Sequence, residues 1–196
     1  MPENSNIEEK SDEELVGLAI KDQAVFLHIM NRYQAKLLYY IKRISGLSND
    51  EAEDVLQDVF IKIYQNLNDF DIDLKFSSWA YRITHNQVIS NFRKIQARPQ
   101  NAGIDLNDDS LRGLAADLDI EGKIDNSLLR EKINKILNNL EYKYKEVLIL
   151  KFFEEKDYKE ISDILKKPMG TVASLMNRAK IKFREEMDRR DSLEIK

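Results

Sequence analysis

Side chains able to bind nucleic acid gather in one stretch near the middle of the chain. From Leu74 to Ile104 the sequence holds no acidic residue, while basic, aromatic and amide side chains are frequent. Guanidinium groups neutralise phosphates, aromatic rings stack on unpaired bases, and an amide can hydrogen-bond a base edge. At about 100° per residue, one helical face of this stretch carries Trp79, Arg82, Asn86 and Arg93. The pattern predicts a surface for unpaired nucleic acid.

A structural interpretation of the aromatic side chains stays open beside this one. Phe76, Ala80 and Ile83 complete an apolar stripe next to Trp79, so the indole can equally belong to the core. In that case the basic residues are merely solvated.

A second segment that could bind nucleic acid lies near the C-terminus and reads YKEISDILKKPMGTVASLMNRAKIKFREEM. It has the pattern of two helices joined by a tight turn at KKPMG. The predicted core positions are Ile161, Ile164, Leu165, Val172, Met176 and Phe183. This is the helix-turn-helix plan, in which the start of the second helix enters the major groove of DNA. The run from Ile164 to Arg184 is basic and free of acids, although an ordinary helical hairpin with a basic face remains the alternative.

A third unusual surface lies on the helix predicted for Asn49 to Leu67. Its face away from the core carries acids and amides around one apolar side chain, Ile61. The simpler interpretation is that Ile61 is an isolated apolar residue that is tolerated at the surface. The functional interpretation is a docking face, on which the acids contact arginines of a partner helix and Ile61 becomes buried.

The sequence contains few residues that are suited to catalysis or metal binding. With no Cys and two isolated His, there is no thiolate nucleophile and no evident ligand set. We expect His28 to be an ordinary packing or surface residue and His85 to be exposed. No phosphate-binding Gly-rich loop is present, so an enzyme is disfavoured and no cofactor is expected.

The elements that position these surfaces are expected to be helices. Of 196 residues only six are Gly and three Pro, which favours an all-α fold over a sheet with many turns. Two capping boxes, Ser11 with Glu14 and Ser48 with Glu51, mark helix starts. A long amphipathic helix is predicted from Gln23 to Ser45, ending at Gly46.

Charge distribution divides the chain into two small helical domains. Residues 1–94 and 95–126 each carry a net charge of −4, whereas residues 127–196 carry +4. The middle segment holds three of the six glycines and no sustained helical stripe, so we expect an acidic flexible linker there. The predicted domains are therefore 1–94 and 127–196, joined by 95–126.

The N-terminus is polar and acidic, unlike a signal peptide, and no apolar run approaches about 18 residues. We therefore expect a cytoplasmic protein without membrane insertion.

Three ordered segments, EAEDVLQDVFIKIYQNL, FSSWAYRITHNQVISNFRK and YKEISDILKKPMGTVASLMNRAK, together resemble the bacterial extracytoplasmic-function (ECF) sigma factors. The resemblance covers the chain from about Asp12 to Met187. It implies binding to core RNA polymerase, through the clamp of its largest subunit, and to promoter DNA. The docking residues it implies are Asp54, Gln57, Asp58 and Ile61.

For the −10 promoter element, the resemblance implies that the helix from Phe76 to Arg93 and the loop before it open the duplex and hold an extruded base. The candidate residues are Phe70, Lys75, Phe76, Trp79, Arg82, Asn86, Arg93 and Lys94. The C-terminal domain is expected to recognise the −35 element as duplex. Its candidate residues are Thr171, Ala173, Ser174, Leu175, Arg178, Lys180 and Lys182.

Two departures from the family pattern have physical consequences. Lys166 stands where the turn of the helix-turn-helix usually has glycine, so we expect it to adopt a left-handed conformation at a cost of about 1 kcal/mol. The recognition helix lacks two basic residues that are common in the family. Leu175 or Ala173 is expected to contact thymine methyl groups instead, with phosphates bound further along the helix.

The main alternative is a DNA-binding regulator that never engages polymerase and uses its first domain to dimerise or to bind an effector. A dimerising face would be broadly apolar, unlike the face around Asp58. The sequence leaves open whether an anti-sigma factor binds the chain, and which promoters it serves.

Overall fold

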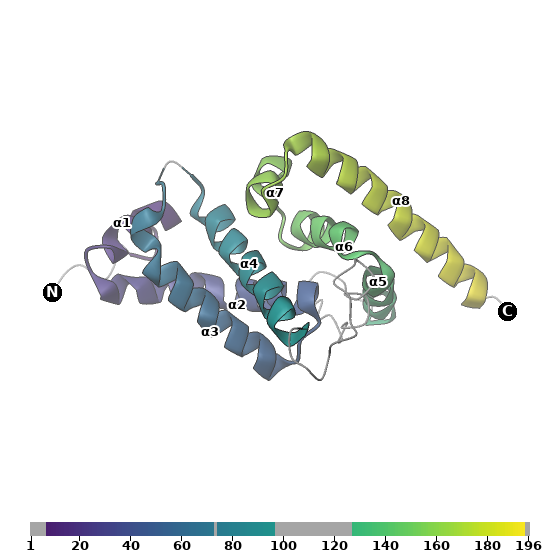
Figure 1. Ribbon diagram of the computed structural model, residues 1–196, viewed down its shortest axis with the longest axis horizontal. Helices are drawn as coiled ribbons and strands as arrows, with labels where there is room; N and C mark the ends of the chain where they lie inside the picture. The colour runs from purple at the N-terminus through teal and green to yellow at the C-terminus, as the bar shows by residue number, and fades with distance from the viewer. Residues whose placement is uncertain (1–6, 73, 97–126, 195–196) are drawn as a thin grey trace.

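The structure is a computed structural model that describes residues 7–72, 74–96 and 127–194, and every regular element in these ranges is helical (Figure 1). The first domain contains α1 (Asp12–Ala19), η2 (Gln23–Val25), α2 (Phe26–Ser45), α3 (Asn49–Gln65), η3 (Leu67–Asp69) and α4 (Phe76–Gln96). The second contains α5 (Ser127–Asn139), α6 (Tyr142–Leu148), η6 (Ile149–Phe153), α7 (Tyr158–Leu165) and α8 (Met169–Glu194). The expected all-α fold with two helical domains is confirmed.

Helix starts in the first domain follow the predicted caps. Both capping boxes form, with Ser11 Oγ accepting from the backbone of Glu14 and Ser48 Oγ from that of Glu51. Gly46 ends α2 in the left-handed region at φ 70°. The start predicted at Gln23 differs in detail, because the Asp22 carboxylate accepts from the Ala24 amide at 2.9 Å and holds one 3-10 turn before α2.

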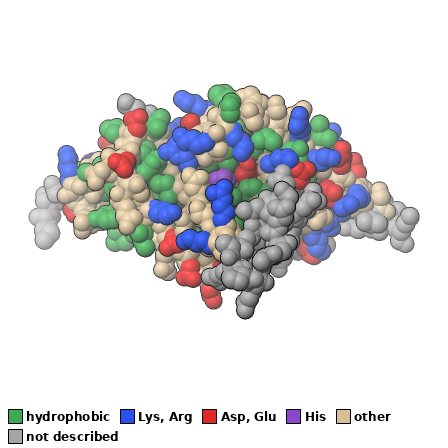
Figure 2. Space-filling model, viewed as in Figure 1, with side chains coloured by type: hydrophobic (Ala, Val, Ile, Leu, Met, Phe, Trp, Pro, Cys, Tyr) green, Lys and Arg blue, Asp and Glu red, His purple; other side chains and the backbone are tan. Residues whose placement is uncertain are grey.

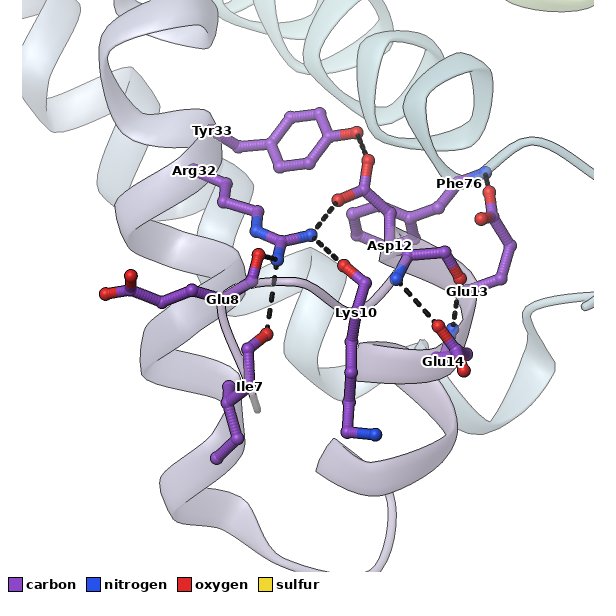
Figure 3. Close-up of polar contacts among 10 residues, drawn as sticks. Ile7, Glu8, Lys10, Asp12, Glu13, Glu14, Arg32, Tyr33 and Phe76 are labelled. Atoms are coloured by element: carbon purple, nitrogen blue, oxygen red, sulfur yellow. Dashed lines mark hydrogen bonds and ion pairs between the residues drawn. The ribbon is translucent and has the colours of Figure 1, made fainter. Parts of the chain in front are cut away.

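Arg32 on α2 fixes the segment that leads into α1 (Figure 3). Its guanidinium donates to the carbonyls of Ile7, Glu8 and Lys10, and it forms an ion pair with Asp12 at 2.9 Å. The Tyr33 hydroxyl donates to the other oxygen of Asp12. Glu13 of α1 accepts from the backbone N–H of Phe76 at 2.9 Å, which satisfies one free amide at the start of α4. One cluster of polar contacts therefore ties α1, α2 and α4 together.

The second domain contains the predicted helix-turn-helix in α7 and α8. The expected core positions Ile161, Ile164, Leu165, Val172 and Met176 are buried, and Phe183 packs partly buried against the same core. The segment ahead of α7 is a short helix, α6, followed by a π-helical turn, η6.

Lys166 ends α7 with φ 53°, so the expected left-handed conformation is confirmed. The next residue is held by the hydroxyl of Ser162, which donates to the Lys167 carbonyl at 2.6 Å, and by a backbone bond from Lys167 N–H to the Ser162 carbonyl. Ser162 therefore helps to hold the backbone of this turn.

Helix α4 lies on the side of the first domain that faces the second: it contacts α2 and α3 of its own domain and α7 of the other (Figure 1). Buried side chains of both domains form one continuous cluster. Helix α4 continues to Gln96, two residues past the predicted domain boundary, and the rest of the predicted linker lies outside the described residues. None of the helices in the described ranges is both long enough and apolar enough to cross a bilayer.

The left-handed backbone conformation of Lys166 leads to a prediction about the stability of the fold. Replacing Lys166 with Gly should raise the free energy of unfolding by about 1 kcal/mol, because glycine adopts positive φ without a Cβ clash. Chemical denaturation monitored by circular dichroism measures the change. Lys166→Ala is the matched control, since it removes the long side chain and keeps the Cβ. Equal stability of the two variants would contradict the assignment of strain to this residue.

Candidate nucleic-acid interface

The polar residues of the predicted −10 surface lie on the outside of α4 and just before it. Asn86, Arg93 and Lys94 are exposed, Arg82 is half-buried, and Lys75 is exposed ahead of the helix. Figure 2 shows Lys and Arg side chains gathered over the middle of the molecule, where α4 and α7 lie. Cationic and amide groups of the kinds that can contact phosphates and base edges therefore lie at the surface here.

The aromatic residues of the same prediction are in the core. Phe76 is fully buried and Trp79 is 8% exposed. The Trp79 ring lies 5.3 Å from that of Phe70 and 5.7 Å from that of Phe76, and Phe76 packs edge-on against Tyr33. These three aromatic side chains therefore position α4 and offer no open stacking face in this conformation. For Trp79 the geometry favours the core interpretation that the apolar stripe left open.

The predicted docking face lies on α3. Asp54, Gln57 and Asp58 are exposed, and Ile61 is 54% exposed among them. Asp58 also accepts a hydrogen bond from the buried Gln87 of α4 at 2.8 Å. The four residues thus share one solvent-facing surface on a helix whose opposite side, around Val59 and Ile63, is fully buried.

Helix α8 presents the predicted −35 residues unevenly. Thr171, Ala173 and Ser174 at its start are exposed, whereas Leu175 is half-buried and packs against the core. Further along, Arg178, Lys180 and Lys182 are exposed. Lys182 forms an ion pair with Glu185 at 2.9 Å, and its hydrogen bond to that carboxylate raises the pKa of Lys182. The exposed first turn and the basic later turns are suited to base edges and phosphates respectively.

Several polar residues between the domains were not identified from the sequence. His85, expected to be exposed, is instead mostly buried, and its Nε2 lies 3.0 Å from Glu146 Oε2 of α6. Glu154 accepts hydrogen bonds from Arg43 and Tyr81. A further capping box, Asp157 with Glu160, starts α7, and it could have been found by the same spacing that identified the other two. The residues that form the interdomain contacts lie far apart along the chain, so no short sequence pattern identifies them.

The second domain also contains an apolar groove of about 570 Å³ between α5, η6 and α8. Ile133, Leu137, Phe152, Phe183 and Met187 contribute to its lining, and Lys180 and Arg184 lie beside them. Its volume lies within the range of ligand pockets in proteins.

Comparison with known proteins identifies the class. The family described as Sigma-70 region 2 matches residues 29–98, and Sigma-70 region 4 matches residues 130–183. The ECF RNA polymerase sigma factor SigW of Bacillus subtilis (strain 168) is 32% identical over 85% of this chain and 90% of that protein. RNA polymerase sigma-H factor of Pseudomonas aeruginosa is 30% identical over 88% of this chain and 91% of that protein. The chain belongs to the ECF RNA polymerase sigma factors, a family of transcription initiation factors.

Solved structures share the fold. CnrH in complex with the cytosolic domain of CnrY matches with a TM-score of 0.66 at 22% identity, over 91% of this chain and 98% of that one. The sigma factor RpoE of Bartonella quintana, in complex with the anti-sigma factor NepR, also gives 0.66 at 22% identity, over 83% and 96%. In both cases the structural likeness extends across both helical domains.

The burial of Trp79 and the exposure of Asn86 predict effects of very different size for two alanine substitutions. Trp79→Ala should lower the free energy of unfolding by about 3–5 kcal/mol, because it leaves a cavity in the aromatic cluster. Asn86→Ala, on the exposed side of α4, should change it by less than about 0.5 kcal/mol. Urea unfolding of both variants tests this. A small effect of Trp79→Ala would mean that the indole is not part of the core.

Proposed function

We propose that this chain binds core RNA polymerase, recognises −35 and −10 promoter elements, and promotes opening of the duplex for transcription initiation. It acts as a binding factor without a reaction of its own, in the cytoplasm where polymerase and DNA are found. The observation that best supports the proposal is the joint exposure of three distinct surfaces, on α3, α4 and α8, in a chain of this family.

Each surface has a proposed partner. The α3 face of Asp54, Gln57, Asp58 and Ile61 is suited to the polymerase clamp, because acids around one exposed apolar side chain complement a basic helical surface. The start of α8 is suited to the major groove of the −35 element. Arg82, Asn86, Arg93 and Lys94 of α4, together with Lys75, are suited to the phosphates and base edges of the −10 element.

An anti-sigma factor is a further proposed partner. CnrH and RpoE were each solved bound to a protein, and the partner of RpoE is an anti-sigma factor. The apolar groove beside α8, with Lys180 and Arg184 near it, supports docking of an apolar helix that carries acidic side chains. We propose this surface for such a partner.

Run-off transcription with core polymerase and a genomic promoter library tests the proposed function as a whole. Specific transcripts that appear only when the chain is added would support it. A chain that binds promoter DNA but never directs core polymerase would instead be a regulator of the other class considered above.

The α3 surface makes a sharper prediction. Ile61→Glu should weaken binding to core polymerase by about tenfold or more, because it places a charge at the apolar centre of the proposed contact. Surface plasmon resonance with immobilised core enzyme measures the affinity. Ile20→Glu is the control, since Ile20 is 47% exposed and lies at the end of another helix, α1. Equal affinities of the two variants would remove the basis for this docking face.

Mutations in α8 should separate the sequence preference of DNA binding from its affinity. Arg178→Ala should weaken binding to all −35 sequences about equally and lower the salt slope by about one unit, as expected for one lost phosphate contact. Ser174→Arg should instead change which sequences are selected, because an exposed guanidinium in the first turn can bind guanine. Ser174 is preferred over Leu175 for this test, since Leu175 packs against the core. Selection from a randomised −35 library, with affinities measured at several salt concentrations, distinguishes the two effects. An unchanged selected motif with Ser174→Arg would show that the first turn does not face the bases.

A further inference from the structure

A buried amide of α4 contacts the proposed docking face of α3. Gln87 is 4% exposed, and its Nε2 donates to Oδ2 of Asp58 at 2.8 Å. Asp58 is exposed on α3, which packs beside α4 (Figure 1). The two residues lie 29 positions apart in the chain, so the contact exists only in the folded domain. A side chain outside the docking face therefore binds one of the four residues within it.

The orientation of this amide is fixed by the chemistry of its partner. An ionised carboxylate only accepts hydrogen bonds, so the NH2 group of Gln87 has to face Asp58 and the amide carbonyl has to point elsewhere. That carbonyl oxygen, Oε1, is buried and has no hydrogen-bond partner among the described residues. A buried acceptor without a donor destabilises a fold, because it has given up its hydrogen bonds to water. Gln87 thus binds Asp58 with half of its amide unsatisfied.

A purely structural role explains Gln87 poorly. The neighbouring core is apolar, since Val59 of α3 and Val88 and Phe92 of α4 are all buried in it. An apolar side chain of similar length at position 87 would extend this core and leave no acceptor unsatisfied. Exchanges of that kind are often neutral or stabilising. Within the described part of the chain, the one hydrogen bond that such an exchange would remove is the bond to Asp58.

The bond from Gln87 gives the Asp58 carboxylate a fixed orientation. Asp54, one turn earlier on α3, is also exposed, and like charges four residues apart on a helix repel each other. The hydrogen bond to Oδ2 restrains Asp58 against this repulsion and leaves Oδ1 available to a partner. The planar guanidinium of an arginine pairs with a carboxylate through two parallel hydrogen bonds. A carboxylate that is already oriented loses less side-chain entropy when such a pair forms.

We propose that Gln87 is a positioning residue for polymerase docking, which orients Asp58 for an arginine of the partner surface. The inference rests on the proposed function, because it concerns the α3 face that is assigned there to core polymerase. It adds a residue of α4 to that assignment and names the partner group that Asp58 receives.

An apolar substitution at position 87 tests the proposal, because affinity and stability should respond differently. Gln87→Met keeps the length of the side chain and removes both polar groups of the amide. We expect the affinity for immobilised core polymerase, measured by surface plasmon resonance, to fall about threefold to tenfold, as when one more side chain must be ordered on binding. The urea midpoint of the free chain should stay the same or rise. If Gln87→Met does not fold, Gln87→Leu takes its place in the same measurements.

A double-mutant cycle shows whether Gln87 acts through Asp58. Asp58→Ala removes the carboxylate, so adding Gln87→Met to this variant should cause no further loss of affinity. Thr84→Val is the matched control. It removes another buried polar group of α4, a hydroxyl that donates to the carbonyl of Ala80 at 2.9 Å within the same helix, and it should leave the affinity unchanged.

Three results would overturn the positioning role of Gln87. They are an unchanged affinity with Gln87→Met, an equal loss of affinity when Asp58→Ala is already present, and a lowered urea midpoint, which would make the residue a structural one. The proposed function is judged separately. If Ile61→Glu and Asp58→Ala weaken binding and Gln87→Met does not, the docking face stands without Gln87. If the parent chain does not bind core polymerase, the proposed function fails and the positioning role fails with it.

Discussion

Helix α4 is packed from two sides at once, and the rest of the structure depends on this constraint. One side carries Phe76 and Trp79 into the aromatic cluster with Phe70 and Tyr33. Another side presents Tyr81 and His85 to the carboxylates of the second domain. Only the remaining strip, around Asn86 and Arg93, faces solvent. The proposed contact of α4 with DNA therefore depends on that strip.

The contact of α4 within the first domain differs in physical character from its contact with the second domain. The contact within the first domain is apolar and aromatic, so its loss exposes large rings to water at considerable cost in free energy. The contact with the second domain combines a shared apolar core with ion pairs and hydrogen bonds. Its polar groups are satisfied only when the two domains are in register.

One lysine just ahead of α4 has partners in the second domain. Lys75 Nζ lies 3.2 Å from Glu160 Oε1 and 3.9 Å from Asp157 Oδ2 at the start of α7. These carboxylates contact the charge that the proposed function assigns to a promoter phosphate. The α3 face around Ile61 is exposed.

The sequence by itself determined the local structure and the family. Capping boxes at Ser11 and Ser48, the stop at Gly46 and the left-handed Lys166 depend on residues a few positions apart, so their physics is visible in the chain. Only the tertiary structure decided that Trp79 is core, that Leu175 is half-buried, and that His85 has a charged partner. Periodicity places a residue on a helical face, but burial depends on what covers that face. For α4 this was a domain whose contacting carboxylates lie about 60 or more residues further along the chain.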